Sequence, residues 1–313
     1  YWDWRQQKTA YYFLRENCSF ELLGLLDATR PGLKLQANFS GAVIPTDTVR
    51  AIAAAGLITQ VSWRASASTR LNAQIARNSS SVNERVIRAL DERSLAPLQA
   101  LPHHEQAQAL ETTYDAQYRR FNYDQRSDYG PWFRQLLVAR SKLDLPEQRP
   151  QLTTPTTRPE HSHRTARVGI GLQSANGTDS LLLHYRPAYH DVLDDPAGYR
   201  PGSRVSVLES TLRVDLSNTG SARLGLERFT LLAVDTFTPV DALTTPISWS
   251  AFLGAEPHLG DGSTLRWHTQ PSFDASAGLT TAIGSQSYCH GQVAFANRFG
   301  PGLADGWESR IGP

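Results

Sequence analysis

The sequence predicts an α+β protein in which a helical N-terminal half precedes an antiparallel β-domain. Apolar residues recur at the helical spacing of three and four up to about residue 145, and beyond residue 163 they alternate with the strand period of two. Between these halves, prolines are interleaved with threonines, which is typical of an extended linker. We therefore expect a helical region over 1–145, a linker over 146–163 and a β-domain over 164–313.

Composition and charge narrow the possible partners. The net charge is +1 and charged residues make up 19% of the chain, which is not the basic excess of a nucleic-acid-binding protein. No apolar run approaches the length of a transmembrane helix, although transmembrane strands are too short to be found in this way. Gly169-Ile170-Gly171 is too short for a nucleotide-binding fingerprint. We expect no nucleic-acid partner and no cofactor.

Several apolar patterns predict the N-terminal helices. The aromatic run 11–14 fits a buried strand or a helix end, and Leu22, Leu23, Leu25 and Leu26 form one helix face that ends at Pro31-Gly32. Further helices are expected at these positions: after Pro45-Thr46, with Val49 and Ile52 inward; at a capping box Ser81–Glu84, followed by Val86, Ile87 and Leu90; through Leu110, Tyr114 and Tyr118; and through Trp132, Leu136 and Leu137.

Strand-like alternation follows the linker. It covers residues 167–172, 181–186, 224–234, 249–253 and 288–299, with Gly-, Asp-, Asn- and Pro-containing turns between them. Glycines and polar residues opposite rows of Leu, Val and aromatics fit a barrel with a polar lumen, but a soluble β-sandwich gives the same alternation. The chain ends in a glycine-rich stretch without a closing strand, so we expect an incomplete sheet.

Cys18 is the leading candidate for a catalytic residue. Asn17 is a favourable N-cap, so Cys18 would be the first residue of a helix. A helix N-terminus favours the thiolate form, because its unpaired N–H groups and the helix dipole stabilise an anion. A lone cysteine before an apolar helix is also compatible with a small buried hydrophobic residue, and the residues alone leave both interpretations open.

The histidines and acids of the second half are weaker candidates. His161-Ser162-His163 has a spacing that suits a metal, but with no cysteine or acidic cluster nearby it favours an exposed loop. In Tyr189-His190-Asp191, neighbouring side chains on a strand point to opposite faces, so a turn after Tyr189 is the preferred interpretation. Asp191, Asp194 and Asp195 lack the ligand spacing of a calcium loop. No metal site is predicted.

The segment Tyr11-Tyr12-Phe13-Leu14-Arg15-Glu16-Asn17-Cys18-Ser19-Phe20-Glu21-Leu22-Leu23 resembles the hallmark of bacterial envelope proteins that carry the Lnb N-terminal periplasmic domain. The likeness continues through residues 44–49, 139–141, 186–191 and 246–249. The Asn-Cys dipeptide is also similar to lecithin retinol acyltransferases, which belong to the permuted NlpC/papain-like superfamily. The resemblance implies the helical back half of a permuted papain-like domain, followed by an outer-membrane-like barrel.

The same resemblance implies a cysteine-dependent acyltransferase or hydrolase of the Gram-negative envelope. Cys18 would be the nucleophile, Asn17 would cap and position its helix, and a thioester would carry an acyl chain from a lipid or an acylated protein. The histidine of that family lies upstream of the cysteine, so we expect a fragment whose base precedes Tyr1. Lipoprotein substrates and a periplasmic or outer-membrane location follow from the likeness. The alternative is a non-catalytic docking protein anchored in the outer membrane.

Overall fold

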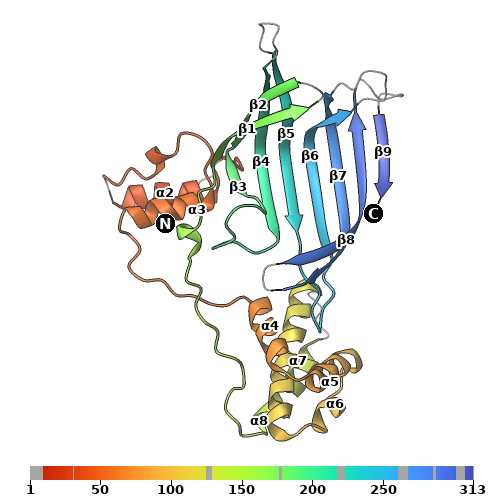
Figure 1. The fold of residues 1–313 in the computed structure, drawn as a ribbon. Coiled ribbons are helices and arrows are strands. Elements are labelled where there is room, and N and C mark those ends of the chain that lie inside the picture. Colours follow the sequence, from red (N-terminus) through yellow and green to blue (C-terminus); the bar gives the residue numbers. More distant parts are fainter. Residues whose placement is uncertain are drawn as a thin grey trace. The chain divides into compact units, whose positions relative to one another are not determined.

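A computed structural model describes residues 10–30, 32–124, 129–175, 178–216, 223–259, 267–284, 287–300 and 307–312, and it confirms the α+β class (Figure 1). The described residues form seven α-helices and one sheet of nine strands. The helices are α2 (Cys18–Thr29), α3 (Pro45–Ala54), α4 (Ala67–Arg77), α5 (Ser80–Glu92), α6 (Ala96–Gln99), α7 (His103–Asp124) and α8 (Gly130–Ser141), with short 3₁₀ turns η1 (Gln36–Asn38) and η3 (Pro159–His161).

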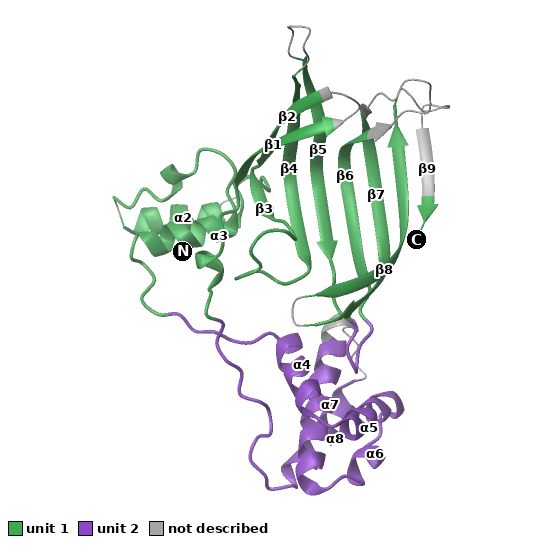
Figure 2. Cartoon of the chain, viewed as in Figure 1, with its two compact units in different colours: residues 1–60, 156–239, 246–313 green, residues 61–155, 240–245 purple. Residues whose placement is uncertain are grey.

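The chain divides into two compact units (Figure 2). The sheet unit comprises residues 1–60, 156–239 and 246–313, and the helical unit comprises 61–155 and 240–245. The first two helices therefore group with the β-strands, although more than a hundred residues separate them in the chain. Each unit is described by itself below.

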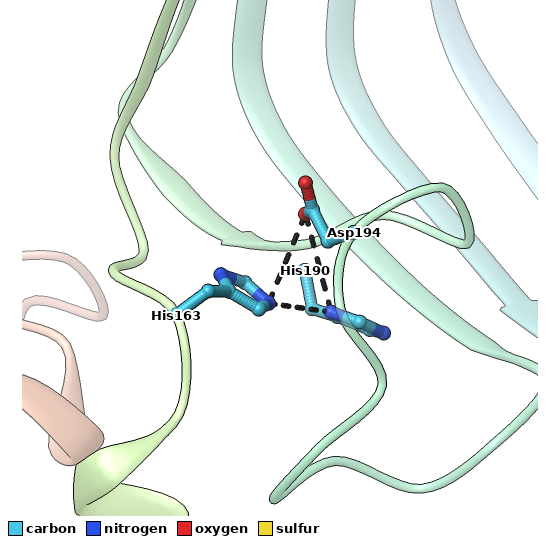
Figure 3. Close-up of side chains that lie close together, drawn as sticks. All are labelled: His163, His190 and Asp194. Atoms are coloured by element: carbon cyan, nitrogen blue, oxygen red, sulfur yellow. Dashed lines mark hydrogen bonds and ion pairs between the residues drawn. The ribbon is translucent and has the colours of Figure 1, made fainter.

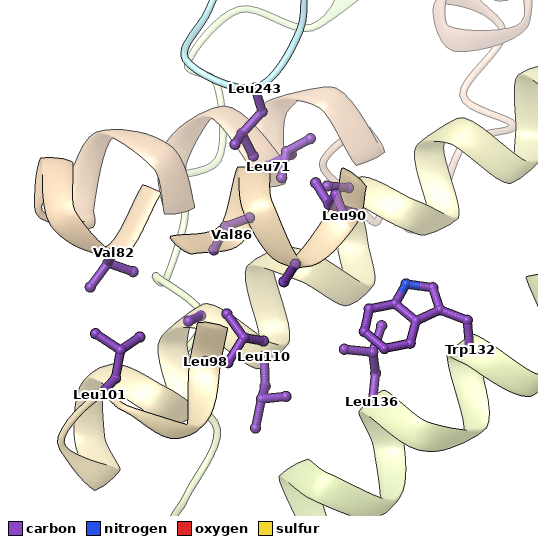
Figure 4. Close-up of a cluster of buried hydrophobic side chains, with 13 residues drawn as sticks. Leu71, Val82, Val86, Leu90, Leu98, Leu101, Leu110, Trp132, Leu136 and Leu243 are labelled. Carbon is purple, nitrogen blue, oxygen red and sulfur yellow. The ribbon is translucent and has the colours of Figure 1, made fainter. Parts of the chain in front are cut away.

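The helical unit is built around α5, α7 and α8 (Figure 4). Val86, Leu110 and Leu136 are buried in one cluster with Trp132, as their helical spacing predicted. The predicted capping box at Ser81 is wrong by two residues. Ser79 is the N-cap of α5, and its hydroxyl accepts a hydrogen bond from the N–H of Val82, so Ser81 already lies inside the helix.

The proline-rich stretch 144–155 contains no helix or strand, yet it is fastened to α7. The guanidinium of Arg149 donates to both carboxylate oxygens of Asp115, at 2.9 and 3.0 Å, and these bonds hold the pKa of Arg149 above its ordinary value. The buried carboxylate of Glu111 accepts the N–H of Gln148 and pairs with Arg140 at 2.7 Å. This stretch therefore packs as part of the helical unit.

Three expectations about the N-terminal part of the sheet unit differ from the structure. Tyr11, Tyr12 and Phe13 are exposed, because a turn closed by a hydrogen bond from Arg15 N–H to the Tyr12 carbonyl replaces the expected buried element. On α3, Val49 is exposed as well. On α2, only Leu23 of the four predicted leucines is fully buried.

The nine strands form a single antiparallel sheet in the order β1-β2-β4-β5-β6-β7-β8-β9, with β3 paired to β4. Within the described residues β1 and β9 are unpaired edges, so this sheet is open rather than a closed cylinder or two packed sheets. The strands are β1 (Arg167–Ala175), β2 (Thr178–Arg186), β3 (Ala188–His190), β4 (Ser203–Asp215), β5 (Arg223–Thr236), β6 (Ser248–Leu259), β7 (Trp267–Ala282), β8 (Tyr288–Phe299) and β9 (Trp307–Gly312).

The predicted alternation lies within strands β1, β2, β5, β6 and β8. Alternation did not reveal β3, β4 or β7. β3 has only three residues, a register shift between Thr211 and Leu212 interrupts the period of β4, and polar and small residues hide that of β7. β9 corrects the expectation that the chain has no strand after β8, since Trp307–Gly312 pairs with β8. None of the helices in the described ranges combines the length and the apolar character needed to cross a membrane.

One face of the sheet is apolar and exposed across all eight strands of the main path. Residues directly opposite each other in the register share a face, as in the row Leu172, Leu181, Val214 and Leu224. We call this the apolar face. Its large exposed members are Val168, Ile170, Leu172, Leu183, Tyr185, Leu212, Leu224, Leu226, Leu232, Trp249, Leu253, Phe273, Leu279, Val293, Phe295, Phe299 and Ile311.

The opposite face carries paired charges. Arg213 pairs with Glu227 at 2.8 Å, Arg228 with Glu256 at 2.6 Å, and Arg204 with Asp235 at 3.2 Å. Because burial is the largest influence on Asp235, its pKa is raised despite the arginine beside it. The sheet is therefore amphipathic, with hydrophobic side chains on one side and ion pairs on the other.

The core of the helical unit provides a test of this packing. Leu136 is 1% exposed and its neighbour Leu137 is 54% exposed on the same helix. Leu136→Ala should lower the free energy of unfolding by about 2–5 kcal/mol, because it leaves a cavity. Leu137→Ala should change it by about 0.5 kcal/mol or less. Urea denaturation followed by helical circular dichroism measures both, and equal losses would contradict the assigned face.

Candidate functional site

The start of α2 presents Cys18 on a capped helix. Asn17 is the N-cap, and its Oδ1 accepts hydrogen bonds from the N–H groups of Ser19 (3.1 Å) and Phe20 (3.2 Å) and from the Ser19 hydroxyl (2.6 Å). Asn17 is buried, whereas Cys18, the first helical residue, is exposed and carries a free thiol. The cysteine is thus accessible at a helix start rather than packed as a small hydrophobic residue.

The amide nitrogen of Asn17 holds this helix start in place. Its Nδ2 donates to the carbonyl of Val43 at 2.7 Å and to that of Phe13 at 3.1 Å. The backbone N–H of Val43 in turn donates to the Leu14 carbonyl at 2.7 Å. One side chain therefore caps α2 and ties it to the segment that leads into α3.

Arg50 on α3 connects these helices to the segment before β1. Its Nε donates to the Glu160 carbonyl at 3.0 Å, and its Nη2 donates to the carbonyls of Ser162 (3.2 Å) and His163 (2.7 Å). Asp47 pairs with Arg50 and also accepts the Thr165 hydroxyl at 2.5 Å. These contacts hold the backbone of residues 160–165, which includes His163, in place.

His163, His190 and Asp194 meet beside this segment (Figure 3). His163 Nε2 lies 2.8 Å from His190 Nδ1, and Asp194 Oδ2 lies 3.9 Å and 4.0 Å from these two nitrogens. His190 comes from β3 and is buried, while Asp194 belongs to the turn that follows. The three residues supply two imidazole nitrogens and a carboxylate oxygen, which are metal-ligand types.

An aromatic stack holds the two imidazole rings. The ring of Tyr199 lies 4.3 Å from that of His190, nearly parallel at 4°, and 4.6 Å from that of His163. Gly198, with φ of +84°, allows this close approach, since a Cβ there would lie 2.9 Å from the Cβ of Ser162. The loop after β3 and the segment before β1 are therefore in direct contact.

Arg186 anchors the carboxylate of the cluster. It is 1% exposed, and its Nη2 lies 2.5 Å from Asp194 Oδ2, which also accepts the N–H of Asp191 at 2.9 Å. Burial alone would raise the pKa of Asp194, but the Asp191 N–H and Arg186 together lower it below its ordinary value. Burial, and then His163, lower the pKa of His190. The environment thus favours a carboxylate at Asp194 and a neutral imidazole at His190.

Sequence reasoning missed this cluster. His163 is half-buried and bonded to His190 rather than free in an exposed loop, and the turn 191–194 follows His190 instead of Tyr189. The contact joins residues 27 positions apart, which local spacing does not reveal. Within the described part of the chain, neither histidine forms a hydrogen bond with Cys18. The sequence signal for this cluster is the concentration of His, Asp and Arg residues at 158–167 and 184–195.

The position of His163 should depend on Arg50. Lysine at this position keeps the charge but loses the planar fork, so Arg50→Lys should free the segment 158–165. Each hydrogen bond from a charged donor contributes about 1.5–3 kcal/mol, so amide exchange there should rise at least about tenfold. Hydrogen–deuterium exchange measures this, with exposed Arg30→Lys on the C-cap of α2 as the control. Unchanged exchange in Arg50→Lys would refute the tether.

Comparisons with known families match three consecutive parts of the chain. Residues 1–55 match the Lnb N-terminal periplasmic domain, and residues 61–152 match a family described as Domain of unknown function (DUF7842). The first match confirms the Lnb part of the resemblance and supports a periplasmic location. Neither the search of curated proteins nor the search of solved structures returned a match.

The third match covers residues 156–313, which contain all nine strands of the described residues and the cluster around His190. The boundaries of the matches at residues 61 and 156 coincide with those of the two structural units. Because this match spans half of the sequence, the chain belongs to the family described as Domain of unknown function (DUF7840).

Proposed function

We propose that this chain is part of a cysteine-dependent acyltransferase or hydrolase of the bacterial envelope, with Cys18 as nucleophile. The observation that carries the proposal is the pairing of an exposed thiol with a buried, fully bonded neighbour at the start of α2. Asn17 would position the helix start through its bonds to Val43 and Phe13. A nucleophile needs such a rigid, accessible position.

The proposed reaction follows from thiol chemistry. The Cys18 thiolate attacks an ester carbonyl, the alcohol leaves with a proton, and the acyl group stays on sulfur as a thioester until an amine or water takes it. The cap bonds of Asn17 engage the N–H groups of Ser19 and Phe20. In the proposed reaction the Cys18 N–H donates to the acyl oxygen. A general base accepts the thiol proton, and the family resemblance implies a histidine in this role.

The apolar face supports a lipid-bearing substrate and a location at the outer membrane. An exposed apolar surface of this extent is typical of contact with lipid or a partner. Strands β1 and β2, with nine residues each, have the length of transmembrane strands, and the two faces alternate as in an outer-membrane barrel. The open edges of the described sheet do not support closure, so the barrel stays a proposal.

Acyl transfer to Cys18 can be tested with an alkyne-tagged palmitoyl p-nitrophenyl ester on the full-length protein. Wild type and Cys289→Ala should both retain a hydroxylamine-sensitive label, because the thioester forms at Cys18. Cys18→Ala should lose the label. Cys289 is the matched control, since it is the other free, exposed cysteine. Equal labelling of all three proteins would refute the nucleophile.

The second candidate is a non-catalytic docking protein anchored at the outer membrane. The apolar face favours it, because that face lies on the sheet and does not involve Cys18. Envelope association without any thioester formation would fit this candidate and not the enzyme.

A lysine on the apolar face should weaken envelope association in either case. Leu172 on β1 is 81% exposed, and Leu193 in the turn after β3 is 86% exposed but lies off the sheet. A buried lysine on a lipid-facing strand costs up to about 2–4 kcal/mol. Leu172→Lys should therefore release more protein into the soluble fraction on urea extraction than Leu193→Lys does. Equal release would contradict lipid contact at this face.

A further inference from the structure

The ligand atoms of His163, His190 and Asp194 lie close enough together to share one ion. A triangle with sides of 2.8, 3.9 and 4.0 Å has one central point that lies about 2.1 Å from each corner. This matches the usual Zn²⁺ distances of about 2.0–2.1 Å to a histidine nitrogen and about 2.0–2.2 Å to a carboxylate oxygen. We propose that His163 Nε2, His190 Nδ1 and Asp194 Oδ2 bind one Zn²⁺ ion.

The hydrogen bonds around the cluster leave the required lone pair on His163. Its Nδ1 lies 2.7 Å from the Arg164 carbonyl oxygen, which can only accept, so Nδ1 carries the proton and Nε2 is free to ligate. A histidine held by a backbone carbonyl through its other nitrogen is the usual outer-shell arrangement of metal sites. Without metal, His190 Nδ1–H donates to His163 Nε2 across 2.8 Å. With metal, the His190 proton moves to Nε2.

The remaining contacts hold the ligands in place before a metal binds. Asp194 is oriented by the Asp191 N–H and by Arg186, and the Tyr199 ring packs against both imidazoles. Arg50 fixes the backbone carbonyl of His163 from α3. A metal bound here would therefore join β3, the turn after it and the segment before β1.

The charges around the site affect which metal ion it binds. Arg186 and Arg167 both reach Asp194, at 2.5 and 3.3 Å, so most of the carboxylate charge is already compensated. Ca²⁺ and Mg²⁺ depend on several charged or carbonyl oxygens, which this site does not offer. Imidazole nitrogens suit Zn²⁺ and its first-row neighbours. The ligand set therefore favours Zn²⁺ over Ca²⁺ and Mg²⁺.

Calorimetric titration of the chelator-stripped full chain with ZnCl₂ tests the site. Wild type should bind one Zn²⁺ ion per chain. His163→Ala should weaken binding by more than the 10–100-fold that loss of an outer-shell partner costs. His161→Ala should bind like wild type, because His161 lies two residues away and bonds to Arg158 outside the cluster. Co²⁺ should give a visible absorption band in wild type and lose it in His163→Ala.

Several outcomes separate this proposal from a loss of folding. Asp194→Asn also disturbs buried Arg186, so His163→Ala, whose ring is half-buried at the surface, is the decisive variant. Its circular dichroism spectrum should match that of wild type. Equal Zn²⁺ affinity in His163→Ala and His161→Ala, or no Zn²⁺ binding by wild type, would overturn the site. Cys18→Ala should bind Zn²⁺ normally, so the metal and the nucleophile are tested independently.

Discussion

The sheet unit depends on the hydrogen bonds of the Arg50 guanidinium, which join α3 to the segment before β1. One side chain on α3 donates to the carbonyls of Glu160, Ser162 and His163 and pairs with Asp47. The planar arginine guanidinium has five N–H donors, which makes this set of bonds possible. A lysine ammonium group, with three donors on one nitrogen, does not reach all of these acceptors. Through Arg50, the helices that match the Lnb domain and the strands that match the DUF7840 family become one compact unit. The His163 cluster is a consequence of this connection.

The sheet unit contains two chemically distinct candidate sites. The start of α2 presents an exposed thiol on a helix whose buried cap is bonded to the chain on both sides. The His163–His190–Asp194 cluster lies where the loop after β3 packs on the segment before β1, under the ring of Tyr199. The first suits acyl chemistry and the second suits a metal, and no hydrogen bond between Cys18 and either histidine joins them in the described residues.

The amphipathic sheet explains why its function is expected at a boundary between water and an apolar phase. Ion pairs such as Arg213–Glu227 satisfy the charges of the polar face, so that face can be hydrated or enclosed. The apolar face, over the described residues, has no ion pairs to satisfy it in water. Its Leu, Val and aromatic side chains are stabilised only when they are removed from water. A periplasmic protein with this face needs lipid or another protein against it.

The sequence by itself determined the α+β class, the helix that begins at Cys18 with Asn17 as its cap, and five of the strands, because these depend on local periodicity and capping. The exposure of Tyr12, the strands of weak alternation such as β4 and β7, and the grouping of residues 1–60 with the sheet were decided by the tertiary structure. The same holds for His163 and His190. Their contact depends on Arg50, Arg186 and Tyr199 acting across distant parts of the chain, and no local pattern records such a convergence.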